Sequence, residues 1–372
     1  MDSALPTDLA AELRTIWHDY RPTRLIELPA LARLAGVGRV MVKAEWERPL
    51  GNFKALGGMV AGLRALARSV GAASLQALLS APGHRARLAK LICASDGNHG
   101  LAVAAAAHRA GTAAIVYLPM SVSRTRADRI AGLGGDVVRV AGTYDDAVAA
   151  AAAAAARGEG LLIPDTSRDP RDPAVRDVMA GYAALTGEIV AQLQNEVRSR
   201  PSHAFVQAGV GGLAAAMAQG LRGVMQASGK LVIVEPESAA CVAHALAVGR
   251  PERIEGELRT CAGMLSCGIA SAHALEILRR YDTGSVLVAE SALRDAVETL
   301  RRTVAVCTTP SGAAGLAGLL QVASRPELRA MHGLGTDSEV LLVITEGPVV
   351  AGDSSVCIGV VVAPDGRIRG EN

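Results

Sequence analysis

The chain has 372 residues, which is more than one small core needs and suits either two domains or one large one. Its 38 basic and 36 acidic residues leave a net charge of +2 without any basic block, so a nucleic acid is not an expected partner. Half of the residues are apolar, but no apolar run reaches the roughly 18 residues that a membrane span requires, so no membrane partner is expected either.

The N-terminal segment and the cysteines favour a cytoplasmic location. Asp2, Asp8 and Glu12 interrupt the first 14 residues, which lack the apolar core of a signal peptide. Six cysteines are scattered along the chain and none of them forms a CxxC pair. We therefore expect reduced thiols and no structural metal site.

Short β-branched segments alternate with Ala- and Leu-rich segments that have helical spacing. The expected strands are residues 40–43, 91–94, 114–118, 136–140, 204–207, 231–234 and 340–344. Two of the expected helices, at 101–109 and 126–133, end at Gly111 and Gly134, where glycine is a common cap. Alternating strands and helices predict an α/β fold with a mostly parallel sheet and helices on both of its faces.

Lys54 lies in an apolar, glycine-rich stretch, residues 51–58 (GNFKALGG). A lysine is costly to bury unless its charge is lost or used. One such use is a Schiff base, in which the neutral amine bonds to an aldehyde cofactor. The alternative is a solvated lysine at the start of a helix, and this stretch alone is compatible with both.

A polar loop, residues 95–100 (SDGNHG), follows the strand expected at 91–94 and opens the next helix. Ligands bind at the carboxyl ends of parallel strands, so this loop is a candidate binding element. Its Asn98 can both donate and accept hydrogen bonds. The alternative is a helix-capping turn, because Asp and Asn are common caps.

A glycine-rich loop follows the strand expected at 204–207, and its residues are Gly209, Val210, Gly211, Gly212 and Leu213. Glycines let backbone amides turn towards a phosphate, and the N-terminus of the next helix adds a favourable dipole.

The same loop allows another interpretation. Residues 209–214 also fit the G-x-G-x-x-A dinucleotide pattern, with Glu235 as a possible ribose ligand, so a nicotinamide-dependent oxidoreductase is a distant alternative. That alternative leaves the Lys54 and Asn98 loops without a role, whereas one phosphorylated aldehyde accounts for all three loops.

Taken together, these loops make the chain resemble the fold-type II pyridoxal-phosphate enzymes and, within them, the diaminopropionate ammonia-lyases. The resemblance extends from about Pro22 to Thr345. Further matching segments are Tyr144-Asp145-Asp146, Asp165-Thr166, Gly181-Tyr182, residues 262–268 (AGMLSCG), Ser311-Gly312-Ala313 and Thr345-Glu346-Gly347. Each segment alone is weak, but the set is specific.

The resemblance implies two domains, each an open, mostly parallel twisted sheet flanked by helices. Residues 1–66 with 186–372 would form a large cofactor-binding domain, and residues 67–185 a small domain. The implied cofactor is pyridoxal 5'-phosphate, and the implied assembly is a homodimer.

The resemblance also implies roles for the loops. Lys54, next to Phe53, would form the Schiff base and act as the base at the substrate α-carbon. Asn98 would hydrogen-bond the phenolate oxygen of the cofactor, and the loop from Gly209 to Leu213 would hold its phosphate. Thr345 would face the pyridine nitrogen, with Ser311 as the alternative, and a neutral hydroxyl there would keep that nitrogen largely unprotonated.

Asp96 separates this chain from serine and threonine dehydratases, which usually have alanine or serine at that place. A carboxylate there would be a second base opposite Lys54 or would hold a substrate ammonium, and Asp165 would act with it unless it is a simple turn residue. Two carboxylates suit a small amino-acid substrate with an extra amine.

The implied reaction is α,β-elimination of ammonia from 2,3-diaminopropionate, giving aminoacrylate and then pyruvate and a second ammonia. The alternatives are a serine/threonine dehydratase or a β-replacement enzyme of the same fold.

Two segments depart from the family pattern, residues 46–50 (WERPL) and residues 269–271 (IAS). A changed substrate pocket is therefore expected, and another β-substituted amino acid stays an alternative. Cys241 and Cys267 fall where family members tend to have cysteine, and whether they pair stays open.

Overall fold

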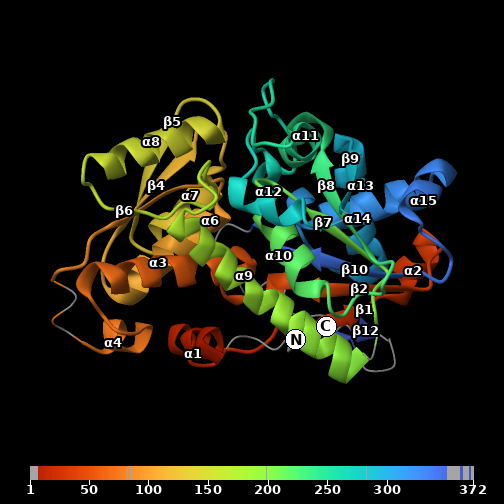
Figure 1. The fold of residues 1–372 in the computed structure, drawn as a ribbon, viewed down its shortest axis with the longest axis horizontal. Coiled ribbons are helices and arrows are strands. Elements are labelled where there is room, and N and C mark those ends of the chain that lie inside the picture. The colour runs from red at the N-terminus through yellow and green to blue at the C-terminus, as the bar shows by residue number, and fades with distance from the viewer. Residues whose placement is uncertain are drawn as a thin grey trace.

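The computed structural model describes residues 7–349, apart from 82, 84, 85, 198 and 282, together with residues 361–362 and 368–369. Figure 1 shows two groups of strands, each covered by helices; α3 (Lys54–Val70) lies with the left-hand group, and α9 (Pro173–Gln192) crosses the middle of the molecule. The α/β architecture predicted from the alternating strands and helices is confirmed.

The larger sheet has six strands in the order β1-β2-β10-β7-β8-β9. All neighbours are parallel except β1, which is antiparallel to β2 at one edge. The strands are β1 (Leu25–Glu27), β2 (Arg39–Ala44), β7 (His203–Gln207), β8 (Lys230–Pro236), β9 (Thr283–Val288) and β10 (Glu339–Ile344). A separate antiparallel pair joins β11 (Val361–Val362) and β12 (Ile368–Arg369).

The smaller sheet has four parallel strands in the order β5-β4-β3-β6. They are β3 (Leu91–Ala94), β4 (Ala114–Pro119), β5 (Gly135–Val140) and β6 (Leu161–Leu162). Its helices are α6 (Asn98–Ala110), α7 (Arg124–Ala131) and α8 (Tyr144–Ala156). In α8, Thr143 and Asp146 form a capping box, which satisfies backbone N–H groups of the first turn.

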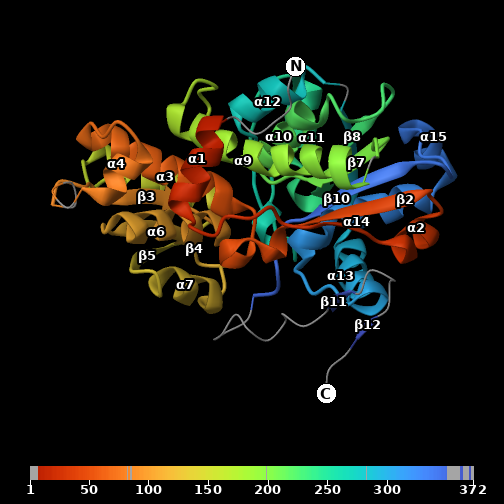
Figure 2. The same ribbon diagram turned by 90° about the horizontal axis from the view of Figure 1, so that it is seen from below.

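Helices cover both faces of the six-stranded sheet (Figure 2). On one side lie α10 (Gly212–Leu221) and α12 (Ala272–Leu278), and on the other α13 (Glu290–Val304) and α14 (Pro310–Ala323). The remaining helices are α1 (Thr7–Ile16), α2 (Pro29–Ala35), α3 (Lys54–Val70), α4 (Leu75–Ser80), α9 (Pro173–Gln192), α11 (Cys241–Val248) and α15 (Pro326–His332).

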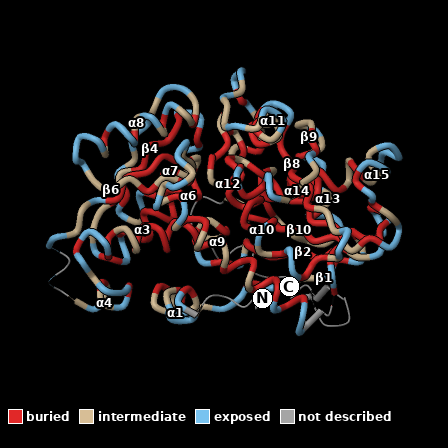
Figure 3. Tube along the Cα trace, viewed as in Figure 1, coloured by how far each residue is buried: buried red, intermediate tan, exposed pale blue. Residues whose placement is uncertain are grey.

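Strand β10 shows why the central strands are continuous apolar runs. Leu341 and Val343 belong to the core that extends into the smaller sheet, whereas Val340, Leu342 and Ile344 belong to the core under α13 and α14. Both faces are therefore buried, as expected for a parallel sheet. The buried segments in Figure 3 follow these strands.

The seven predicted strands are present, with bounds that differ by one or two residues at most ends. Three further strands of the two main sheets, β1, β6 and β9, were not predicted. The first two have only three and two residues, and the edge strand β9 contains Gly284 and Ser285 and is partly exposed, so none carries a strong apolar signal.

The predicted domain boundaries, after residues 66 and 185, fall inside α3 and α9. These two helices pack closely against each other because small residues face the contact. A Cβ added to Gly181 would lie 2.5 Å from the Leu56 carbonyl oxygen, and one added to Gly57 would lie 2.5 Å from the Tyr182 ring. Within the described part of the chain, no helix combines the length and the apolar character needed to cross a membrane.

We predict that Gly181→Ala lowers the free energy of unfolding by about 1–3 kcal/mol, because the added methyl group overpacks the α3–α9 contact. Urea denaturation of the cofactor-free protein measures this change. Gly223→Ala is the matched control, since a Cβ at Gly223 meets no atom within 4 Å. Equal stability of the two variants would contradict the close contact.

Candidate functional site

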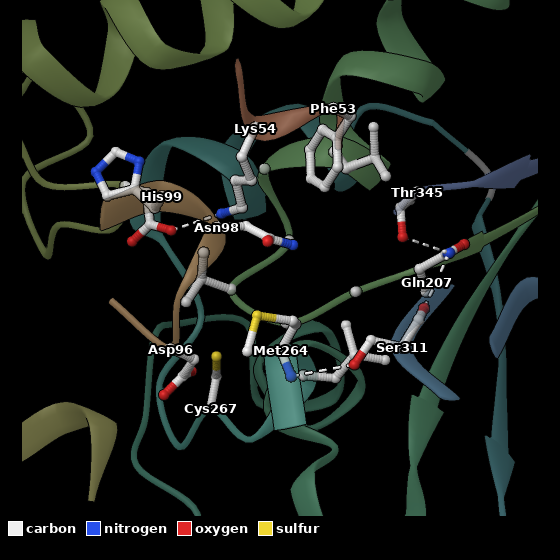
Figure 4. Close-up of a pocket in the computed structure, with 18 of the residues that line it drawn as sticks. Phe53, Lys54, Asp96, Asn98, His99, Gln207, Met264, Cys267, Ser311 and Thr345 are labelled. Carbon is white, nitrogen blue, oxygen red and sulfur yellow. Dashed lines mark hydrogen bonds and ion pairs between the residues drawn. The ribbon is translucent and has the colours of Figure 1, made fainter. Parts of the chain in front are cut away.

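The site lies where the two sheets meet, in a pocket lined by every residue proposed from the sequence for a pyridoxal-phosphate site. Figure 4 shows ten of the lining residues by name. The predicted residues that line it are Phe53, Lys54, Asp96, Asn98, Asp165, Gly209, Val210, Gly211, Gly212, Leu213, Ser311 and Thr345.

Lys54 is the first residue of α3, and the turn before it is held tightly. Leu50 and Gly51 both have positive φ angles, 70° and 72°, which turn the chain sharply into the helix. The Phe53 amide then donates to the Thr345 carbonyl oxygen at 3.1 Å, which fastens the turn to the end of β10. Lys54 thus starts a helix, but its side chain is only 20% exposed rather than solvated.

The Lys54 ammonium forms an ion pair with Asp165, with Nζ 2.6 Å from Oδ2. The Tyr144 hydroxyl donates to the other carboxylate oxygen. Burial alone would lower the pKa of Lys54, but the Asp165 charge outweighs burial and holds that pKa above its ordinary value. Burial alone would raise the pKa of Asp165, but Lys54 and the Tyr144 hydrogen bond hold it below its ordinary range. Both groups are therefore charged at neutral pH.

Of the four lysines in the chain, all within the described residues, Lys54 alone lines this pocket. Lys43 is fully buried elsewhere and pairs with Glu188 at 2.8 Å. Lys90 is half exposed, and the Lys230 ammonium contacts the Met331 carbonyl oxygen at the surface. Lys54 is therefore the one amine in a position to react with an aldehyde bound here.

The loop after β3 is organised by Ser95 rather than by Asp96 or Asn98. The Ser95 hydroxyl oxygen accepts from the Gly97 and Gly100 amides at 2.8 Å each. This leaves the Asp96 side chain in the pocket, where Figure 4 shows it beside Cys267. Burial, and then the negative charge of Asp165, raise the pKa of Asp96 well above its ordinary value.

Asn98 is the first residue of α6, but its side chain does not cap the helix, so the capping alternative is wrong. Its Nδ2 donates to the Glu346 carboxylate. Its Oδ1 accepts from Arg126 at 3.3 Å. The neighbouring His99 is buried, and its Nε2 lies 2.8 Å from the Ile163 carbonyl oxygen.

The glycine loop leads into α10, whose N-terminus has no side-chain cap. Gly211 has φ of 93°, which glycine adopts easily. Gly209 is confined, since an added Cβ would lie 3.1 Å from the Met264 carbonyl oxygen and 3.2 Å from the Cys267 sulfur. Unpaired N–H groups at a helix N-terminus fit a phosphate.

Glu235 contradicts the dinucleotide interpretation. Its carboxylate is fully buried and accepts from the Val242 and Ala243 amides at 2.8 Å each, at the start of α11. It therefore caps a helix rather than facing the pocket, where a ribose would have to bind.

Two hydroxyl groups line the wall opposite Lys54. Gln207 Nε2 donates to Thr345 Oγ1 at 3.1 Å, and the Met264 amide donates to Ser311 Oγ at 3.1 Å. Each hydroxyl group accepts one bond from the protein and also carries a proton that it can donate into the pocket. Figure 4 shows both side chains on this wall.

These features fit pyridoxal phosphate. Lys54 would bind its aldehyde, the α10 N-terminus its phosphate, and Asn98 and a hydroxyl of Thr345 or Ser311 its ring. The buried Tyr182 hydroxyl, which has no hydrogen-bond partner among the described residues, faces the same pocket. When bound, the cofactor supplies an electron sink for the substrate carbanion.

Several lining residues were not predicted as site residues, among them Tyr144, Tyr182, Gln207, Met264, Cys267 and Glu346. Of these six, all except Gln207 lie within the matching segments, which was the available signal. Cys241 and Cys267 carry free thiols, and Cys241 Sγ lies 3.2 Å from the Gly209 carbonyl oxygen. The divergent residues 46–50 and 269–271 do not line the pocket.

Comparison with known proteins agrees with this chemistry. A family model described as pyridoxal-phosphate dependent enzyme matches residues 16–346, and the chain belongs to this family. The diaminopropionate ammonia-lyase of Escherichia coli (strain K12) is 31% identical over 341 residues, covering 88% of this chain and 85% of the relative.

Two further relatives are informative. A crystal structure of the Escherichia coli diaminopropionate ammonia lyase, in complex with an aminoacrylate-PLP azomethine reaction intermediate, has a TM-score of 0.80 and 29% identity, covering 93% of this chain and 90% of that one. A biosynthetic L-threonine dehydratase of Pasteurella multocida (strain Pm70) is 29% identical over 329 residues, covering 86% of this chain and 57% of the relative.

We predict that Asp165→Asn shifts cofactor capture by the cofactor-free protein to lower pH. Without the Asp165 charge, burial dominates and the pKa of Lys54 falls, so more of the amine is neutral at a given pH. The measurement is the rate at which absorbance of the bound cofactor develops after mixing, as a function of pH. Asp169→Asn is the control, since Asp169 is 59% exposed and pairs with Arg171. The same pH midpoint in wild type and Asp165→Asn would show that the ion pair does not set the pKa of Lys54.

Proposed function

We propose that this chain, a pyridoxal-phosphate dependent enzyme, eliminates ammonia from 2,3-diaminopropionate or a similar β-substituted amino acid. Water then converts the released aminoacrylate to pyruvate and a second ammonia. The observation that carries this proposal is the pair of acidic residues that line the pocket with Lys54, because Asp165 pairs with Lys54 and is held ionised whereas the pKa of Asp96 is raised. Two carboxyl groups in one pocket can take different roles when their pKa values are shifted in opposite directions.

We propose distinct roles for these three residues. Lys54 holds the cofactor and removes the α-proton from one face. Asp96 is suited to remove the α-proton from the opposite face, because burial raises its pKa and makes its carboxylate a stronger base than an ordinary one. Asp165 keeps the Lys54 nitrogen in place and offers a negative charge to the second amine of the substrate.

We also propose that Asn98 donates to the ring oxygen of the cofactor, and that the amides of residues 209–213 bind its phosphate. Thr345 would meet the ring nitrogen, with Ser311 as the alternative. The homodimer, the cytoplasmic location and the two domains with boundaries at residues 66 and 185 remain predictions from the sequence.

A serine/threonine dehydratase is the second candidate, because the L-threonine dehydratase is a relative of similar identity. Its leaving group is a hydroxyl, which carries no positive charge, so the ionised Asp165 would have no second amine to hold there. A β-replacement enzyme is a third possibility within the same fold.

The purified protein is predicted to show visible absorbance from bound cofactor, which shifts when 2,3-diaminopropionate is added and is followed by pyruvate release in a coupled assay. Lys54→Ala should lose both the absorbance and the turnover, because no other lysine lines the pocket. A spectral shift without pyruvate would direct the search to other β-substituted amino acids. Absorbance and turnover that persist in Lys54→Ala would contradict the proposal.

Asp96→Ala and Asp96→Asn should reduce kcat/KM for one enantiomer of 2,3-diaminopropionate by roughly 100-fold or more, and for the other enantiomer much less. Only one enantiomer presents its α-proton to Asp96. A base must be deprotonated to act, and the pKa of Asp96 is raised. As the pH is lowered, wild-type activity on that enantiomer should therefore begin to fall at a higher pH than it would if the base were an ordinary carboxyl group. Equal losses for both enantiomers would remove the two-base assignment.

A further inference from the structure

Arg126, on α7 beside the smaller sheet, and Glu346, just after β10 of the larger sheet, meet at Asn98. Arg126 Nη2 lies 3.2 Å from Glu346 Oε1. Arg126 Nη1 donates to Asn98 Oδ1 at 3.3 Å, and Asn98 Nδ2 donates to Glu346 Oε2. The three side chains therefore form a closed ring of hydrogen bonds across the junction of the two sheets.

The ring is shielded from water. The Arg126 and Glu346 side chains are 13% and 3% exposed, and Asn98 is buried. The Thr309 hydroxyl also donates to Glu346, which fixes the carboxylate. Hydrogen bonds to charged groups are stronger than neutral ones, and they are less screened when they are buried.

The two charges determine which way the Asn98 amide points. A flipped amide would place its oxygen against the Glu346 carboxylate and its NH₂ group against the Arg126 guanidinium, and both contacts would be unfavourable. In the observed orientation Nδ2 has a second N–H, which Glu346 does not use. That second N–H is a donor available to the pocket.

We propose that Arg126 and Glu346 are positioning residues that keep the Asn98 amide oriented as a donor to the ring oxygen of the cofactor. This inference rests on the role proposed above for Asn98. Neither residue need touch the substrate, since their effect reaches the site through one amide.

The surrounding backbone accommodates this arrangement. Gly97 has φ of 136°, and a Cβ added there would lie 2.9 Å from Arg126 Cδ, so a larger residue would displace the arginine. One turn further along α7, Arg129 Nη2 donates to the Leu50 carbonyl oxygen at 2.9 Å, in the turn before Lys54. Helix α7 therefore supplies both Arg126, which contacts Asn98, and Arg129, which contacts the turn before Lys54.

The test compares Arg126→Met, Glu346→Gln and the control Arg124→Met in the presence of pyridoxal phosphate. Arg124 lies on the same helix, and its side chain is 93% exposed. We expect Arg126→Met and Glu346→Gln to weaken cofactor binding on the order of tenfold, equivalent to about 1.4 kcal/mol, and to change the visible spectrum of the bound cofactor. Arg124→Met should match wild type in both readouts.

A double-mutant cycle with Asn98→Ala separates positioning from a general contact between the two sheets. If the pair acts through Asn98, Arg126→Met should cost little further affinity once Asn98 is absent. Full additivity in the Asn98→Ala background would overturn the inference, as would a match between Arg126→Met and Arg124→Met. Thermal melting without cofactor shows whether Glu346→Gln folds. If it does not, the double-mutant cycle of Arg126→Met with Asn98→Ala still tests the inference.

These outcomes are distinguishable from a failure of the proposed function. A wild-type protein that does not bind pyridoxal phosphate would refute that function. A wild-type protein that binds the cofactor, with Arg126→Met unchanged, would refute only the positioning role.

Discussion

The ion pair between Lys54 and Asp165 is the interaction around which the site is arranged. Lys54 is the first residue of α3, which follows β2 of the larger sheet in the chain, and Asp165 follows β6 of the smaller sheet. Neither charge would be tolerated alone at this depth, because an unpaired buried ion is expensive. The pair therefore links the two parts of the fold and also holds a reactive nitrogen at their junction.

The divergent residues before the lysine contribute to a second buried group of charges. Arg48, within 46–50, is buried and pairs with Glu45 at 2.7 Å and with Glu188 of α9 at 2.8 Å. Lys43 pairs with Glu188 as well, which gives a buried network of two cations and two anions under the lysine turn. Residues 46–50 lie just before the lysine motif in the chain and do not line the pocket, so their divergence does not by itself alter the contacts of a substrate.

Much of the fold and part of the site could be predicted from the sequence, for identifiable reasons. Central parallel strands are buried on both faces, so the apolar run of β10 was visible without a structure. Loops after strand carboxyl ends converge in such sheets, which placed Asn98 and the residues 209–213 in one site. The resemblance to a known family then assigned chemistry to loops that spacing alone could not.

The contacts that could not be predicted link residues far apart in the chain. Arg126 and Glu346 are 220 residues apart, and nothing in either local sequence specifies the other. The capping role of Glu235 was missed for a different reason, since its partners Val242 and Ala243 are near in the chain but its place at a strand end is equally compatible with a ribose ligand. The local sequence pattern predicts where a strand ends. The residue that its side chains contact there depends on how the whole chain packs.

The central claim is that Lys54 carries the cofactor, and chemical trapping tests it most directly. Reducing the cofactor-loaded enzyme with borohydride makes the bond to the lysine permanent, and peptide mass spectrometry then identifies the modified residue. We expect the cofactor mass on Lys54 and on no other lysine. Modification of Lys43, Lys90 or Lys230 instead, or bound cofactor with no covalent adduct, would contradict it.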